Sequence, residues 1–263
     1  MRTSHQRRSA IARRLVEQGS VVVGELAAEF GVSRETIRND LEALEKVGVA
    51  QRTHGGAVHT QQGMELPWFQ RDTLNADVKL AIAKAVVDLI QSASTIVLDS
   101  GSTTHLVAKL LSLREEITVI TPSMSVVSAL SRSPGIAVIV PGGELRQITQ
   151  GLVGPWAAER LRQVDADVAV LGANSIAHVA GPATTNLQET AVKQAMLTAA
   201  RRTVLAVDSS KALTRSTYIF AEWRAFDAVV TDNGLPPEVA HVIEQHTELV
   251  LTDQPSTPSL GHA

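Results

Sequence analysis

The stretch Thr95-Ile96-Val97-Leu98-Asp99-Ser100-Gly101-Ser102-Thr103-Thr104 decides the fold of this chain. Its apolar run at 95–98 predicts a buried strand, and the segment at 105–111 predicts a helix. The free amides at the start of such a helix bind anions, and small residues let the backbone approach a ligand. The hydroxyls of Ser102, Thr103 and Thr104 add further donors. This strand-helix junction is either an anion-binding loop or a simple helix cap, and the rest of the chain has to decide between the two.

Short apolar runs recur along the second part of the chain, with helical segments between them. Strands that alternate with helices predict a doubly wound, mostly parallel α/β sheet. Ligands of such sheets bind beyond the carboxyl ends of the strands. The predicted strands are 96–98, 118–120, 137–140, 168–171, 203–207 and 228–231, with 248–251 as a further candidate.

The residues that follow these strands share one chemistry, because they are hydroxyls, glycines, amides and lysine. Lysine supplies a point charge while amides and hydroxyls distribute hydrogen bonds, which suits a polyhydroxylated anion such as a sugar phosphate. The predicted effector-binding residues are Asp99, Ser100, Gly101, Ser102, Thr103, Thr104, Ser123, Gly142, Gly143, Asn174, Lys193 and Lys211.

Some of these residues also have a purely structural interpretation. Asp99 can cap the end of its strand, and Gly142 with Gly143 can simply make a turn. Lys193 can pair with Glu189, which lies four residues earlier on the same predicted helix. These alternatives remain open at the level of sequence.

The first sixty residues predict a different unit. Apolar residues recur at helical spacing at 10–16, and a second short helix at 25–30 ends at Gly31. Ser33 is then the N-cap of a third helix at 34–44. Two helices joined by a glycine-containing turn are typical of the helix-turn-helix motif.

The third helix exposes polar side chains near its start, where a recognition helix presents them to base edges in the major groove. Its Ile37, Leu41 and Leu44 face inward at helical spacing. The strands 49–53 and 57–59 then flank glycines and predict a hairpin wing. The predicted DNA-binding residues are Ser33, Arg34, Thr36, Arg38, Asn39, Arg52 and His54.

Several charged residues of this unit also have two interpretations. Arg34 and Arg38 either read bases or bond only phosphates. His54 either shapes the wing or contacts DNA. Asp40 is interpreted as structural, capping the helix or pairing with an arginine.

Composition limits the class of protein. A chain of 263 residues with 44% hydrophobic and 19% charged residues predicts two globular domains with ample core. The absence of cysteine excludes disulfides and thiolate metal sites, and the scattered histidines lack ligand spacing, so we predict neither a metal nor a cofactor. No signal peptide or membrane span is evident, which predicts a cytoplasmic protein with no membrane partner. The net charge of −3 excludes a wholly basic nucleic-acid coat.

Domain boundaries follow from shifts in pattern. The segment around Gly63 and Pro67 lacks periodicity and predicts a linker. We therefore predict a winged helix-turn-helix domain at 1–59, a linker at 60–77, an effector-sensing α/β domain at 78–252 and a disordered tail at 253–263.

Two groups of motifs resemble the DeoR family of bacterial transcriptional regulators. The sequence at 24–41, followed by Arg52-Thr53-His54-Gly55-Gly56-Ala57, resembles the winged helix of that family. The resemblance implies a sensor domain related in fold to ribose-5-phosphate isomerases and similar sugar-phosphate enzymes. The motifs that resemble the sensor domain are 98–104, 141–146, 151–155, Glu189 with Lys193, and 208–211.

Two positions depart from the family pattern. Asn39 stands where the family usually has a second arginine before the aspartate, so the base preference there is not carried over. Asn174 stands where the regulators usually have aspartate and the isomerases have catalytic carboxylates, so the effector's identity is not carried over either. Moving a proton between sugar carbons needs a carboxylate base, and an amide cannot act as one. We therefore predict ligand binding without catalysis.

The sequence thus predicts a repressor of a carbohydrate-metabolism operon that a phosphorylated sugar or related metabolite releases from operator DNA. One winged helix has a small footprint, so we expect a homodimer or homotetramer. No residue decides between repression and activation. The alternative is a sugar-phosphate isomerase-like enzyme with an appended DNA-binding domain, for which Glu144, Glu189 or Asp208 would be the candidate base.

Overall fold

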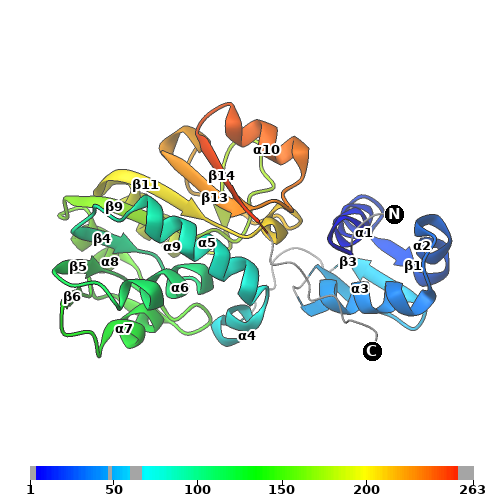
Figure 1. Ribbon diagram of the computed structural model, residues 1–263, viewed down its shortest axis with the longest axis horizontal. Coiled ribbons are helices and arrows are strands. Elements are labelled where there is room, and N and C mark those ends of the chain that lie inside the picture. The colour runs from blue at the N-terminus through cyan, green and yellow to red at the C-terminus, as the bar shows by residue number, and fades with distance from the viewer. Residues whose placement is uncertain (1–3, 47–48, 60–66, 254–263) are drawn as a thin grey trace, which may run out of the picture.

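The structure is a computed structural model that describes residues 4–46, 49–59 and 67–253. Its N-terminal part is a winged helix-turn-helix unit, which Figure 1 shows in blue beside the larger α/β unit. The elements of this unit are α1 (Ser4–Gln18), β1 (Ser20–Val22), α2 (Val23–Phe30), α3 (Arg34–Lys46), β2 (Ala50–Arg52) and β3 (Gly56–His59).

The three helices enclose a small apolar core that contains Ile37, Leu41 and Leu44, as the helical spacing predicted. The helix α2 ends at Gly31, whose φ of 63° lies in the left-handed region that favours glycine. These features confirm the predicted helix-turn-helix.

The wing has one strand more than predicted. β1 pairs antiparallel with β3, which gives the strand order β1-β3-β2. Three residues are too few to show a strand period, so the sequence carried no signal for β1. Gly56 is required at this pairing, because a Cβ there would lie 1.9 Å from the carbonyl oxygen of Val21.

A short helix, α4 (Trp68–Thr73), lies within the segment predicted as a linker. The backbone N–H of Trp68 donates to the carbonyl oxygen of Ile148 (2.8 Å), and its ring meets the ring of His105 edge-on at 5.1 Å. The end of the predicted linker is therefore packed against the α/β unit. Residues 60–66, and the predicted tail beyond residue 253, lie outside the described residues.

The α/β unit is built on a seven-stranded sheet in which every pairing is parallel. The predicted doubly wound α/β fold is confirmed, and the candidate strand at 248–251 is real. In sheet order the strands are β14 (Glu248–Thr252), β13 (Ala228–Asp232), β11 (Ala200–Ala206), β9 (Ala166–Leu171), β4 (Thr95–Leu98), β5 (Ile117–Ile120) and β6 (Ile136–Ile139).

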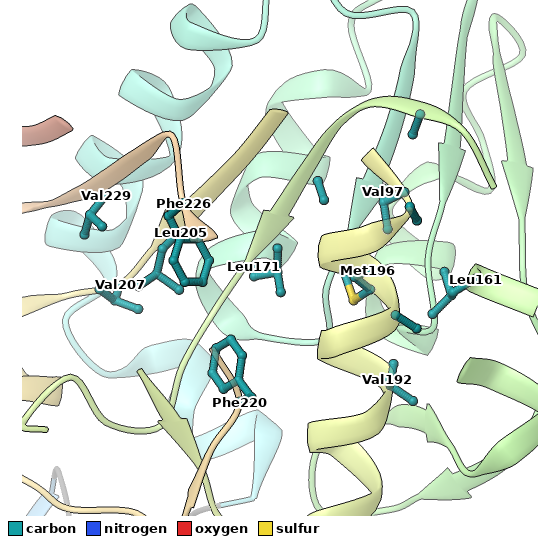
Figure 2. Packing of buried hydrophobic residues seen from close by; sticks show 14 of the residues in the cluster. Val97, Leu161, Leu171, Val192, Met196, Leu205, Val207, Phe220, Phe226 and Val229 are labelled. Carbon is teal, nitrogen blue, oxygen red and sulfur yellow. The ribbon is translucent and has the colours of Figure 1, made fainter. Parts of the chain in front are cut away.

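Helices cover both faces of this sheet and bury two separate apolar cores. Figure 2 shows the core in which Met196 packs near Val97, Leu161, Leu171 and Val192. One face carries α5 (Ala76–Leu89), α6 (Ser102–Leu111) and α7 (Met124–Leu130), and the other carries α8 (Pro155–Leu161), α9 (Leu187–Thr198) and α10 (Pro237–Glu244). Two small hairpins complete the unit, β7 (Glu144–Arg146) with β8 (Gly151–Val153), and β10 (Ala183–Thr184) with β12 (Tyr218–Ile219).

The order of the strands fixes where a ligand can bind. From β4 the chain moves outward to β5 and β6, and it then returns to the other side of β4 to build β9, β11, β13 and β14. The order therefore reverses between β4 and β9. In open α/β sheets, ligands bind in the crevice beyond the carboxyl ends of the strands at such a reversal.

Candidate functional site

A cavity opens at this point of reversal, beyond the carboxyl ends of β4, β9 and β11. We call it the strand-end cavity. Eight of the predicted effector-binding residues line it, which are Ser100, Gly101, Ser102, Thr103, Thr104, Asn174, Lys193 and Lys211. The further lining residues are Arg71, Thr149, Gly172, Ala173, Glu189, Ala206, Val207 and Asp208.

The start of α6 forms one wall of the strand-end cavity. Gly101 is the N-cap in an extended conformation, so the first helical amides follow directly at Ser102. The hydroxyls of Ser102 and Thr103 make no hydrogen bond with any described residue, whereas the Thr104 hydroxyl donates to the carbonyl oxygens of Asp99 (2.7 Å) and Gly101 (3.1 Å). Thr104 therefore holds the junction together, whereas Ser102 and Thr103 have hydroxyls that can bind a ligand.

Beneath this wall lies a buried ion pair between Asp99 and Lys193, which are 1% and 5% exposed. The Lys193 ammonium donates to Asp99 Oδ2 and to the carbonyl oxygen of Gly172 (2.9 Å). Asp99 also accepts from the backbone N–H groups of Ser100 (2.7 Å) and Gly172 (3.0 Å). Asp99 thus closes the strand end from below and does not line the cavity, so its structural interpretation holds.

Glu189 lines the cavity and does not pair with Lys193, so the alternative of a bridge within α9 is wrong. Its Oε1 accepts from Arg146 Nη1 (3.2 Å) and its Oε2 lies 2.9 Å from the Thr184 hydroxyl. The same hydroxyl lies 2.9 Å from Asn174 Oδ1, and its single proton serves only one of the two acceptors at a time. Glu189 is thus ionically held in place while it faces the cavity.

Asp208 brings a second carboxylate to the cavity, beside Lys211. It accepts from Asn75 Nδ2 (3.1 Å) and from the Ser210 hydroxyl. Burial raises the pKa of Asp208, but the ammonium groups of Lys211 and Lys79 and these two hydrogen bonds lower it by more. The pKa of Asp208 therefore lies below its ordinary value, which keeps a charged acceptor in the cavity.

Besides Asp99, three further predicted ligands lie away from the cavity, which corrects the sequence-based site. Ser123 is fully buried as the N-cap of α7, where its hydroxyl accepts from the N–H of Val126 (3.3 Å). Gly142 and Gly143, with φ of 81° and 122°, make the turn into β7. Glu144, a candidate base of the enzyme alternative, is exposed on β7 and does not line the cavity.

Sequence reasoning missed Arg71 and Thr149 altogether and did not place Glu189 or Asp208 among the effector ligands. Glu189 and Asp208 had a signal, because both belong to family-like motifs and carry charge. Arg71 and Thr149 had none, since only the docking of α4 and of the β7–β8 hairpin brings them to the strand ends.

Lys79 fastens the end of α4 beside the cavity. It is 3% exposed, and its ammonium donates to the carbonyl oxygens of Arg71 and Leu74, both at 2.6 Å. Burial lowers the pKa of Lys79 to about 8, from an ordinary value of 10.5.

Raising the pH is expected to stabilise the chain relative to a Lys79→Met variant. Between about pH 8 and pH 10.5 the folded chain has lost the Lys79 proton while the unfolded chain keeps it. The free energy of unfolding therefore rises with pH in this window, by at most about 1.4 kcal/mol per pH unit. This gain in stability from the deprotonation of Lys79 is lost as the pH falls through about 8. Urea unfolding of both proteins at about pH 7.5 and about pH 9.5 measures the difference, and equal changes in the two would contradict it.

The predicted DNA-binding residues gather at the start of α3 and on the wing. Arg34, Arg38 and Asn39 are exposed, and His54 is exposed at the hairpin turn. Ser33 caps α3, because its Oγ accepts from the N–H of Thr36 (3.0 Å) and bonds the Thr36 hydroxyl (2.8 Å). Arg52 pairs with Glu45 (2.6 Å), so it must leave a protein partner to contact DNA.

Asp40 has the structural role that the sequence predicted. Its carboxylate pairs with Arg7 and Arg8 of α1 (2.5 and 2.9 Å), which joins α1 to the recognition helix.

The part of the chain that the structure describes contains neither a metal-binding cluster nor a membrane-spanning helix. No group of three histidine, aspartate or glutamate side chains there is arranged to hold a metal ion. Among the described helices, none has the length and apolar character needed to cross a membrane.

Comparison with known proteins gives matches along most of the chain. Residues 7–62 match the family model of the DeoR-like helix-turn-helix domain, and residues 74–233 match that of the DeoR C terminal sensor domain. Among solved structures, ribose 5-phosphate isomerase A from Methanocaldococcus jannaschii is 22% identical, with a TM-score of 0.38 over 52% of this chain and 54% of its own.

Curated relatives match over nearly their full length. A protein named "Putative aga operon transcriptional repressor" from Escherichia coli O157:H7 is 36% identical over 89% of this chain and 88% of the relative. The glycerol-3-phosphate regulon repressor of Escherichia coli K12 is 30% identical over 92% and 96%, respectively. The transcriptional repressor AccR of Agrobacterium fabrum C58 is 32% identical over 88% and 91%. With both domain models matched in order and relatives aligned over about nine tenths of the chain, this chain belongs to the DeoR family of transcriptional regulators.

Proposed function

We propose that this protein is a repressor of a carbohydrate operon, that its winged helix binds operator DNA, and that a phosphorylated sugar in the strand-end cavity releases it. The observation that carries the proposal is the meeting of the α6 amide end, the hydroxyls of Ser102 and Thr103, and Lys211 in one cavity. The relatives are named as repressors, two of them of the aga operon and the glycerol-3-phosphate regulon. A protein that binds the bacterial chromosome would work in the cytoplasm.

The hydrogen-bonding groups of the cavity suit the two ends of a sugar phosphate. Helix amides, hydroxyls and a lysine bind a phosphate. The carboxylates of Glu189 and Asp208 accept hydrogen bonds from sugar hydroxyls, and the side-chain amide of Asn174 orients them. Effector binding would change operator affinity through a coupling of about 1–3 kcal/mol, or roughly five- to 150-fold.

Fluorescence anisotropy with a labelled duplex from the protein's own promoter tests the proposal. Specific binding is expected to be released by one or a few sugar phosphates and not by the same sugars without phosphate. Binding that is indifferent to sequence would defeat the operator assignment. Specific binding that no sugar phosphate reverses would defeat the effector assignment.

Arg38→Ala is expected to weaken operator binding by about 5- to 150-fold. Arg38 is exposed on the recognition helix, and its pair with Glu35 (3.2 Å) is solvent-exposed and hence weak, so DNA can replace it. If Arg38 reads a base, the loss of affinity is confined to the operator sequence. If it bonds a phosphate, the affinity for all DNA sequences falls, and the slope of log affinity against log salt concentration decreases in magnitude by about one. The control is Arg160→Ala, an exposed arginine of α8, which is expected to bind operator as the wild type does.

An assembly of two or more chains would let paired winged helices read two half-sites. We propose a homodimer or homotetramer on this ground. Sedimentation of the free protein and of its operator complex gives the number of chains, and a single chain in both would refute the assembly.

A second candidate function follows from the position of Glu189. Its carboxylate faces the cavity, where an isomerase would hold a general base. Against this, Glu189 is ion-paired with Arg146, and an amide occupies position 174. Incubation with aldose and ketose phosphates decides: turnover that disappears in a Glu189→Gln variant would establish an enzyme, and absence of turnover under conditions of operator release supports a sensor.

A further inference from the structure

The helix α4 is the first described element after the linker that leaves the winged helix, and it forms part of the strand-end cavity through Arg71. Its first residue, Trp68, is bonded to Ile148. At its other end, the backbone of Arg71 and Leu74 is held by the buried ammonium of Lys79. The next residue, Asn75, donates to the cavity carboxylate Asp208. Both ends of α4 are thus attached to elements that surround the cavity.

A second polar group near α4 is buried beside the cavity. Thr149 is 2% exposed, and its Oγ1 has no hydrogen-bond partner among the described residues. A Cβ built on Gly151 would lie 2.6 Å from Ser100 Oγ and 3.4 Å from Thr149 Oγ1. The hydroxyls of Ser100 and Thr149 therefore both lie close to the backbone of Gly151. A buried hydroxyl without a partner costs free energy, and a ligand that bonds it removes that cost.

The charge of the cavity lining also depends on α4. Arg71, Lys193 and Lys211 bring three cations, against the two carboxylates of Glu189 and Asp208. The charge of Lys193 is already compensated by Asp99. The charge of Glu189 is likewise compensated, by Arg146. The remaining charged groups of the lining are Arg71, Lys211 and Asp208, so without Arg71 the lining carries no excess positive charge for an anionic ligand. A guanidinium is a planar set of donors that matches two oxygens of a phosphate at once.

We propose that Arg71 and Thr149 bind the effector's phosphate together with the start of α6. Binding then makes α4 part of the ligand site, so that occupancy orders the segment through which the sensor domain joins the winged helix. This inference rests on the proposed function, because it names the residues that bind the effector's phosphate and the segment through which effector binding affects the winged helix.

The test compares inorganic phosphate binding by the full chain and by three variants, using thermal-shift titrations in phosphate-free buffer. Arg71→Met is expected to raise the dissociation constant by about 10- to 100-fold, because a charged, bidentate contact is lost. Arg71→Lys keeps the charge, and its dissociation constant is expected to lie between those of Arg71→Met and the wild type. Thr149→Val keeps the shape and is expected to weaken binding by roughly three- to tenfold.

Two controls separate binding from structure. Arg160→Met removes an exposed arginine outside the cavity and is expected to bind phosphate as the wild type does. Hydrogen exchange of residues 67–75 is expected to slow when phosphate binds the wild type, and to slow less in Arg71→Met at equal saturation. A purely structural role of Arg71 would change the melting temperature without phosphate and leave the dissociation constant unchanged.

The outcomes are distinguishable. If the wild type binds phosphate and all three variants bind it equally well, this inference is refuted and the proposed function stands. If the wild type binds its operator specifically but binds no phosphate, the proposed class of effector falls, and this inference falls with it. Should Arg71→Met fail to fold, Arg71→Lys and Thr149→Val decide.

Discussion

Asp40→Ala is expected to destabilise the winged helix by about 3–5 kcal/mol and to abolish operator binding. Asp40 is 1% exposed and accepts from Arg7 and Arg8, so its carboxylate joins α1 to the recognition helix. Removal of the carboxylate leaves the buried guanidinium of Arg7 without its counter-charge. An unpaired buried charge costs far more than the pair contributes, which is why this single change outweighs any exposed DNA contact.

The measurement has to report on the winged helix itself. All three tryptophans, at positions 68, 156 and 223, lie beyond residue 59, so their fluorescence does not follow this unit. Hydrogen exchange of peptides from α1 and α3, measured in the full chain, follows the unfolding of the winged helix. The protection factors of these peptides are expected to fall by more than about 100-fold in Asp40→Ala. Glu42→Ala is the matched control, because Glu42 on the same helix makes only a partly exposed pair with Lys46. Unchanged protection in Asp40→Ala would show that the pair is dispensable.

Asp99→Ala is expected to destabilise the α/β unit by about 3–5 kcal/mol and to remove its response to effector. The carboxylate pairs with Lys193 and also accepts from the N–H groups of Ser100 and Gly172. Three chain segments, the ends of β4 and β9 and the helix α9, meet at this one side chain. Its loss therefore leaves a buried ammonium unpaired and loosens both loops that form the cavity.

Urea unfolding followed by tryptophan fluorescence measures this loss, since all three tryptophans lie in the α/β unit or in α4. A double-mutant cycle with Lys193→Met separates the pair from the other contacts of Asp99. The double variant is expected to be more stable than the sum of the single losses implies, by about 1–3 kcal/mol, because it buries no unpaired charge. Strict additivity would mean that the two groups do not interact.

Individual residues show how far sequence reasoning reaches. The inward positions Ile37, Leu41 and Leu44 followed from helical spacing, and the apolar runs gave the strands, because both patterns are set by neighbours along the chain. The partner of Lys193 did not follow. Spacing offered Glu189, four residues away, as one of two open possibilities, whereas the fold supplies Asp99, which lies 94 residues away.

The sequence by itself determined the winged helix and the doubly wound sheet, and it placed Ser102, Thr103 and Lys211 after strand ends, where they line the cavity. These depend on local periodicity and on the rule that parallel strands end at one edge. Only the tertiary structure decided which side chains face the cavity. It excluded Asp99, Ser123, Gly142 and Gly143 from the cavity lining, and it brought in Arg71 and Thr149. Long-range packing of α4 and the β7–β8 hairpin has no signature in the spacing of residues along the chain.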